Sequence, residues 1–187
     1  MRYLLGLTLL LIITFYAPAP LPAGEEGRID DVVITSSTRD VLLYFQMRDF
    51  LSSEMEQGIE SGLPLTLTFF VEVYRHRWGW WNRKLVDLEF RHVLQYDSLK
   101  EEYLVDRTEG GLREVTTTSL AEARDLLGRV SGMPVIPLEE LEPEQTYTLR
   151  IKARLEDKSR PPLLSRLLPF RRLWSFETDW YSVEFRY

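Results

Sequence analysis

The sequence predicts a mainly β domain, with an antiparallel β-sandwich-like fold of immunoglobulin-like or α+β type and two short helices. Three observations lead to this prediction. Several segments alternate apolar and polar residues with the two-residue period of strands. Turn residues separate neighbouring strand segments closely enough for hairpins. Only two segments combine helical spacing of apolar residues with a capping signal.

The first half of the domain reads as two strands, a short helix and a long hairpin. Strands are expected over 29–36 and 41–47, and Ser53 with Glu56 has the spacing of a helix capping box. The hairpin pairs 65–74 with 86–95. Its predicted register places Val71 opposite Phe90 and Glu72 opposite Glu89, because only registers of this parity keep the apolar residues on one face.

The second half predicts another hairpin, a helix and two more strands. The hairpin pairs 103–107 with 112–117, and a helix begins after Ser119. Its expected apolar face is Leu120, Ala123, Leu127 and Val130, with Gly132 and Pro134 ending the helix. A loop over 137–145 leads to a strand over 146–156. That strand turns Arg150, Lys152 and Arg154 outward, and a last strand ends at Tyr187.

The N-terminus predicts export. Residues 1–24 show the order of a secretory signal, with Arg2 before an apolar run and a Pro- and Ala-rich stretch. The apolar run is shorter than a membrane-spanning helix requires. We therefore expect a signal peptide over 1–24, a single strand-rich domain over 25–187 and a periplasmic location. The alternative is an uncleaved N-terminal membrane anchor.

Composition excludes several classes of protein. The chain has no Cys, so it has no disulfide, thiolate nucleophile or Cys-bound metal. Its formal net charge of −6 argues against a general nucleic-acid binder, which would be basic. About 160 residues after the signal suffice for one domain with a substantial core. In such an acidic domain, local clusters of Lys and Arg become informative.

The tip of the long hairpin is the first such cluster. Three Trp and several cations stand together between the two strands. Trp prefers the polar–apolar boundary of a bilayer, and cations attract anionic head groups. The same group would also suit stacking on a sugar ring or anchoring a protein partner, while a structural reading has single Trp side chains closing the end of the sandwich. The predicted binding residues here are Arg75, Arg77, Trp78, Trp80, Trp81 and Arg83.

Residues 158–174 form the second cluster, with five Lys or Arg and no acidic residue. Leucines lie between the charges, a mixture typical of an interfacial segment or a partner groove. The structural reading is a crossover loop whose leucines pack on the domain. Arg150, Lys152 and Arg154 extend this cluster, unless they form an ordinary solvated strand face. The predicted binding residues here are Arg160, Arg166, Phe170, Arg171, Arg172 and Trp174.

Enzyme motifs are absent from the sequence. It has no G-x-S-x-G, Walker-type or G-x-G-x-x-G motif. His76 and His92 are the only histidines and are expected far apart along the hairpin, which argues against a His metal site or triad. His92 falls on the apolar face, where a hydrogen-bonded core histidine is expected. Glu72 with Glu89 is the remaining acid pair. We therefore expect no catalytic residues, metal or cofactor.

The order of features also resembles a known family. The features are Gly62 to Leu67 as an entry to a long strand, Tyr74-Arg75-His76-Arg77, Trp80-Trp81, the region of Tyr96, the helix after Ser119, the strand from Tyr147 and Trp174 with Trp180. Together they resemble an exported bacterial family known only as a domain of unknown function (number four-three-nine-zero). The resemblance covers 29–187. It implies an envelope location, no known activity and, through gene association, a sensor kinase as one partner.

The sequence therefore predicts a non-catalytic envelope protein that interacts with a membrane-protein or anionic membrane-surface partner. The basic-aromatic segments would form its docking surface, and no nucleic acid is expected. One alternative is a carbohydrate- or ligand-binding module that uses residues 78–81 at the hairpin tip. A weaker alternative is a hydrolase. The sequence leaves the oligomeric state open.

Overall fold

The computed structural model describes residues 27–76, 82–109, 111, 113–156 and 175–187. Its strands are β1 (Arg28–Ser36), β2 (Asp40–Arg48), β3 (Leu65–Arg75), β4 (Arg83–Asp97), β5 (Glu102–Arg107), β6 (Arg113–Thr117), β7 (Arg129–Pro137), β8 (Thr146–Glu156), β9 (Phe176–Glu177) and β10 (Tyr181–Arg186). Its helices are α1 (Ser53–Glu60), α2 (Leu120–Gly128) and a 3-10 turn, η1 (Leu138–Glu140). The mainly β fold class with two short α-helices is confirmed.

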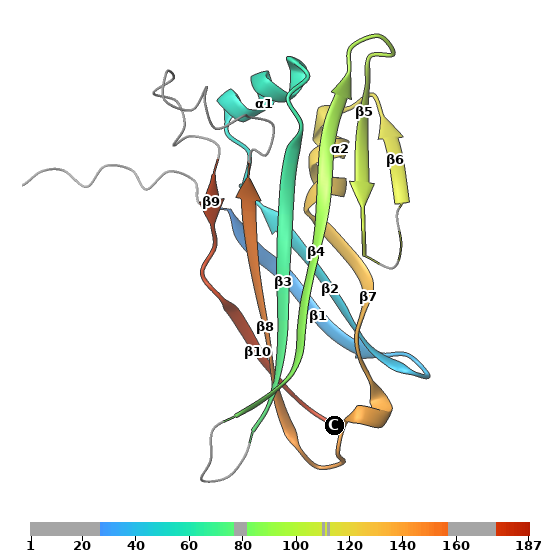
Figure 1. Cartoon of the computed structure of the whole chain (residues 1–187), viewed down its shortest axis with the longest axis vertical. Helices are drawn as coiled ribbons and strands as arrows, with labels where there is room; N and C mark the ends of the chain where they lie inside the picture. Colours follow the sequence, from blue (N-terminus) through green and yellow to red (C-terminus); the bar gives the residue numbers. More distant parts are fainter. Residues whose placement is uncertain (1–26, 77–81, 110, 112, 157–174) are drawn as a thin grey trace, which may run out of the picture.

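The described strands form two antiparallel sheets. The small sheet has the order β1-β2-β7, and the large sheet has the order β10-β8-β3-β4-β5-β6, with β9 also paired to β8. Figure 1 shows the small sheet crossing behind the long strands of the large one, with α1 near the start of β3. The ends of β3 and β4 at Arg75 and Arg83 lie at the opposite end of the sheet.

The core lies between the two sheets because one face of each is apolar. Leu67, Phe69 and Val71 of β3 are fully buried. Phe69 contacts Phe45 of β2 in an edge-to-face arrangement, with ring centroids 5.2 Å apart. The alternation of side chains along β3 thus separates a core face from an outer face.

Both helices begin at a serine cap. The Ser119 hydroxyl accepts a hydrogen bond from the Glu122 N–H at 3.4 Å, as the sequence predicts for α2. In α1 the cap is Ser52 rather than Ser53, and its hydroxyl accepts from the Met55 N–H at 3.3 Å. Either serine can cap a helix, although only Ser53 has the spacing of a capping box, and Ser52, whose backbone is extended, becomes the cap.

The end of α2 differs from the prediction. Val130, assigned to the helix, lies in strand β7, and Gly132 with Pro134 lies within that strand rather than ending the helix. The helix ends at Gly128, where a Cβ would stand 2.6 Å from the carbonyl oxygen of Met47. Only glycine permits this approach to β2, and the β-branched residues that follow favour a strand.

The long hairpin has the predicted parity but a different register. Val71 pairs with Leu88 and Glu72 with Asp87, so the partners differ by two residues from Phe90 and Glu89. A shift of two residues leaves every side chain on its predicted face, so the apolar pattern alone does not distinguish the two registers. A register shift also follows Val73, next to the end of the strand pair.

Candidate functional site: a basic and aromatic sheet face

Most of the predicted binding residues lie outside the described part of the chain. These are Arg77, Trp78, Trp80 and Trp81 of the hairpin tip and Arg160, Arg166, Phe170, Arg171, Arg172 and Trp174 of the second segment. Arg75 and Arg83 are described and pair with each other at the ends of β3 and β4.

Arg75 and Arg83 have different surroundings. Arg75 is only 9% exposed, and its guanidinium forms an ion pair with Glu142. Arg83 is exposed. The structure therefore places Arg75 in a contact that holds the strand end to the segment before β8, and leaves Arg83 accessible.

The outer face of the large sheet brings together the β8 cations and the β3 rings that alternation predicts there with Lys84 and Trp180, which the sequence did not place there. Arg150, Lys152 and Arg154 alternate along β8, and β8 pairs with β3 so that Lys152 stands opposite Phe70 and Arg150 opposite Glu72. Tyr74 follows on the same face of β3. Lys84 contributes from β4 and Trp180 from the residue before β10.

Each of the four cations lies close to a ring on this face. Arg150 Cζ is 4.6 Å from the ring centroid of Trp180 and 5.9 Å from that of Tyr74. Lys152 Nζ is 4.9 Å from the Trp180 centroid and 5.5 Å from that of Phe70. The remaining two contacts are Lys84 Nζ with Tyr74 at 5.7 Å and Arg154 Cζ with Phe70 at 4.8 Å. These distances fall within the range of cation–π attraction. We call Phe70, Tyr74, Lys84, Arg150, Lys152, Arg154 and Trp180 the cation–aromatic face.

Carboxylates complete the charge pattern of this face. Glu72 accepts a hydrogen bond from Lys84 Nζ at 2.6 Å and from the Tyr74 hydroxyl at 2.9 Å. Glu177 of β9 accepts from Lys152 at 2.6 Å and from Arg154 at 2.5 Å. The hydrogen bonds from these two cations lower the pKa of Glu177. The hydrogen bonds to Glu72 and then to Asp87 raise the pKa of Lys84 well above its ordinary value.

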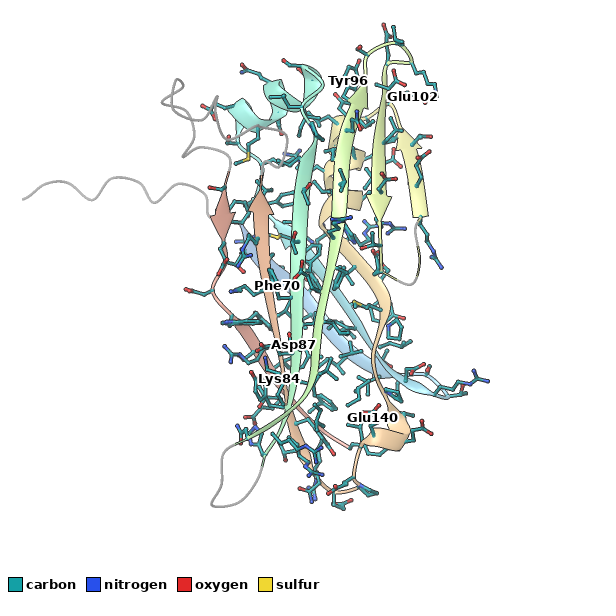
Figure 2. All side chains as sticks on the ribbon, viewed as in Figure 1. Phe70, Lys84, Asp87, Tyr96, Glu102 and Glu140 are labelled. Atoms are coloured by element: carbon teal, nitrogen blue, oxygen red, sulfur yellow. The ribbon has the colours of Figure 1, made fainter. Side chains whose placement is uncertain are left out.

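The place of this face in the molecule follows from β3 and β4. Figure 2 shows Phe70 near the middle of β3, with Asp87 and then Lys84 further from the end that carries Tyr96 and Glu102. The two-residue period of β3 is the sequence signal for two of these rings, because it turns Phe70 and Tyr74 toward the outer face. Trp180 had no such signal, because only the pairing of β10 with β8 brings it to Arg150 and Lys152.

A second polar cluster lies in the core. His92 is fully buried, as predicted for a core histidine. Its Nδ1 lies 2.7 Å from the carbonyl oxygen of Leu127, near the end of α2, and its Nε2 lies 2.6 Å from Glu109 Oε2. Arg107 Nη1 is 3.8 Å from the other carboxylate oxygen. Both ring nitrogens thus face oxygen atoms at hydrogen-bond distance, one of the backbone and one of the Glu109 carboxylate.

The environment of Glu109 combines opposing effects. Burial disfavours its charged form, but the hydrogen bond and charge of His92 and the charge of Arg107 outweigh it, so the pKa of Glu109 is lowered. Arg107 Nε is buried without a hydrogen-bond partner among the described residues. Because the imidazole has no exposed surface, this cluster joins β4, the turn after β5 and α2 rather than meeting a ligand.

The two carboxylates considered for hydrolysis are not cross-strand partners. Glu72 stands opposite Asp87, and its two oxygens accept hydrogen bonds from Lys84 and Tyr74. Glu89 stands opposite Phe70 instead.

A hollow of about 390 Å³ lies between the end of β2 and α2. Its charged residues are already paired, Arg48 with Asp31 at 2.7 Å, Arg124 with Glu56 at 3.1 Å and Asp125 with Arg129. These internal ion pairs leave the hollow without a distinctive set of groups for a ligand.

The fold and the face define a class of protein: an antiparallel β-sandwich with a cation–aromatic outer face. The model of a family described as "Domain of unknown function (DUF4390)" matches residues 24–184, and the chain belongs to this family. The predicted family resemblance is therefore confirmed. No curated protein and no solved structure matches the chain significantly. Within the described ranges, no helix has the length and apolar character needed to span a membrane.

Proposed function

We propose that this protein is an exported, non-catalytic interaction module of the bacterial envelope, docking on a membrane-protein or anionic membrane-surface partner. The cation–aromatic face is the observation that carries the proposal. Arg, Tyr and Trp are the side chains that most often dominate binding energy at protein interfaces. Here they stand beside one another on the outer face of a sheet whose other face forms the core.

The geometry of the face supports recognition rather than general solvation. A ring beside each cation limits the number of conformations of the long side chain, so less entropy is lost when a partner binds. Ion pairs with Glu72 and Glu177 also limit the conformations of the cationic side chains. A strand face of freely solvated Lys and Arg would lack both restraints.

The sequence neighbours of this face belong to the same docking surface in our proposal. The chain runs from Tyr74 directly into the basic-aromatic tip at 77–81, and from Arg154 into the segment 158–174. Both segments carry Trp and cations without acidic residues. Their docking role is an expectation from composition.

The test compares association with the envelope. Cells expressing the protein with Trp180→Ala and Lys152→Gln on the face, or with Trp80, Trp81, Arg166 and Arg171 replaced by Ala, would be fractionated beside the parent chain. We expect both variants to move from the membrane fraction to the soluble periplasmic fraction. An exposed cation in β6, replaced in Arg113→Gln, is the matched control and should leave the distribution unchanged.

Flotation with vesicles separates the two kinds of partner. Binding that requires anionic lipid and weakens with salt would indicate a membrane surface. Envelope association without vesicle binding would indicate a membrane protein. If both groups of replacements leave envelope association at the parental level, the proposed function is wrong.

A further inference from the structure

Among the residues that the structure describes, Arg150 differs from the other cations of the face because no carboxylate lies at hydrogen-bond distance from it. Lys84 has Glu72 at 2.6 Å, and Lys152 has Glu177 at 2.6 Å. Arg154 also hydrogen-bonds Glu177. Arg150 forms a longer ion pair with Glu72, whose Oε2 lies 3.9 Å from Arg150 Nη1. Within the described residues its guanidinium donates no hydrogen bond, although the side chain is only 33% exposed.

The side chain of Arg150 is nevertheless held in place. Its Cζ lies 4.6 Å from the centroid of Trp180 and 5.9 Å from that of Tyr74. The Tyr74 ring is itself fixed by a hydrogen bond from its hydroxyl to Glu72 at 2.9 Å. The guanidinium therefore has ring neighbours that orient it, while its N–H groups keep their donor capacity for a partner.

We propose that Arg150, with Tyr74 and Trp180 beside it, is the binding site for one carboxylate side chain of a protein partner. This inference rests on the proposed function and names the partner chemistry. The planar guanidinium forms two parallel hydrogen bonds with a carboxylate, which gives both strength and direction. Apolar residues next to the acidic side chain of the partner would cover the rings of Tyr74 and Trp180.

The surrounding charges favour one carboxylate over a densely anionic surface. Glu72 lies close to Arg150, and Glu177 stands on the neighbouring cations of β8. A bilayer of anionic lipids or an anionic polymer would bring further negative charges against both carboxylates. A protein segment with a single acidic residue between apolar residues places its charge at Arg150 alone. No carboxylate among the described residues accepts a hydrogen bond from Arg150.

The arrangement along β8 gives this site neighbours of defined spacing. Alternate residues of a strand lie about 6.7 Å apart, so Arg150 and Lys152 are separated by that distance along the face. Trp180 contacts both cations. An extended partner segment lying along β8 would therefore place its acid at Arg150 and its next outward residue near Trp180 and Lys152.

The experiment is an NMR titration of the isotope-labelled protein. The protein is purified in the form that the expressing cells produce. The probe is the peptide acetyl-Ser-Leu-Glu-Leu-Ser-amide, and the matched peptide carries Gln in place of Glu. At millimolar peptide we expect shifts of the Arg150 Nε–H and Trp180 indole N–H signals. The Gln peptide should bind at least about tenfold more weakly, as expected for loss of a charge-assisted bidentate contact.

Two variants and a control test the assignment to Arg150. Arg150→Gln should abolish the response of Trp180, and Arg150→Lys, which keeps the charge but not the fork, should weaken it. Arg113→Gln should bind as the parent does. The amide spectrum of each variant reports whether the fold is intact, and a parental spectrum with lost binding supports the site.

Three results would overturn this inference: equal binding of the Glu and Gln peptides, an unchanged response in Arg150→Gln, or no response to either peptide. Vesicles of anionic lipid are the remaining probe. If they, and not the peptide, shift the Arg150 signal, the partner is a membrane surface, and the protein-carboxylate site is wrong while the proposed docking function stands. The fractionation experiment measures envelope association separately. The proposed docking function and the proposed carboxylate site at Arg150 can therefore fail independently.

Discussion

Two carboxylates lie at the same distance from a basic side chain, but in very different surroundings. Glu109 lies 2.6 Å from His92 in the core, and Glu177 lies 2.6 Å from Lys152 on the outer sheet face. His92 has no exposed surface and Glu109 is 8% exposed, whereas the side chain of Glu177 is 41% exposed. The distance is the same, but the second pair is considerably more accessible to water.

The difference separates stability from recognition. In the core, removal of one partner leaves a buried polar group without compensation, so the pair is costly to break. On the outer face, water replaces either partner at small cost and salt screens the attraction. An ion pair that separates at small cost leaves its side chains able to bind a partner protein instead of each other. We therefore expect mutations in the core cluster to change stability, and mutations on the cation–aromatic face to change binding.

The largest effect is expected from His92→Ala. The change leaves Glu109 buried without its hydrogen-bond donor, leaves the Leu127 carbonyl without its ring N–H and opens a cavity. We expect the free energy of unfolding to fall by about 3–5 kcal/mol, measured from urea transitions. A loss below about 1 kcal/mol would mean that the His92–Glu109 contact is not the buried, mutually dependent pair described above.

An intermediate effect, dependent on pH, is expected from Glu109→Gln. The amide keeps the shape and can donate to His92 Nε2 while Nδ1 still donates to Leu127, so we expect a loss of about 1–2 kcal/mol near neutral pH. Because the folded pKa of Glu109 lies below its ordinary value of 4.5, this carboxylate contributes stability above that value. The contribution is lost as pH falls through the folded pKa.

The difference in stability between the parent and Glu109→Gln should therefore shrink on acidification. Urea transitions of both proteins, recorded from neutral pH down through the folded pKa, measure it. A difference that stays constant or grows as pH falls would contradict the lowered pKa of Glu109.

The smallest effect on stability is expected from Glu177→Gln. Water and the neighbouring backbone contacts of β9 remain after the change, including the hydrogen bond from Thr178 N–H to the Ala153 carbonyl. We expect a loss of at most about 1 kcal/mol, further reduced by salt. At the same time Lys152 becomes available to a partner, so binding of the acidic peptide should strengthen or stay the same. A loss comparable with that of His92→Ala would remove the contrast between the two regions.

The sequence by itself determined the local features of this protein. The alternation in β3 and β4 assigned their side chains to two faces and placed His92 in the core, and the alternation in β8 placed Arg150, Lys152 and Arg154 outside. The Ser119 cap marked the start of α2. These features follow from periodicity and from hydrogen bonds over a few residues, which any segment expresses on its own.

The tertiary structure alone decided which distant segments meet. The register of the long hairpin differs by two residues from its prediction, because both registers bury the same side chains. Residues 129–137 form a strand because β2 offers them a partner edge. Phe70, Arg150 and Trp180 become neighbours only through the pairing of β8 with β3 and β10, and Glu109 reaches His92 only through the turn after β5. Such pairings depend on the fit of surfaces far apart in the chain, which local patterns do not encode.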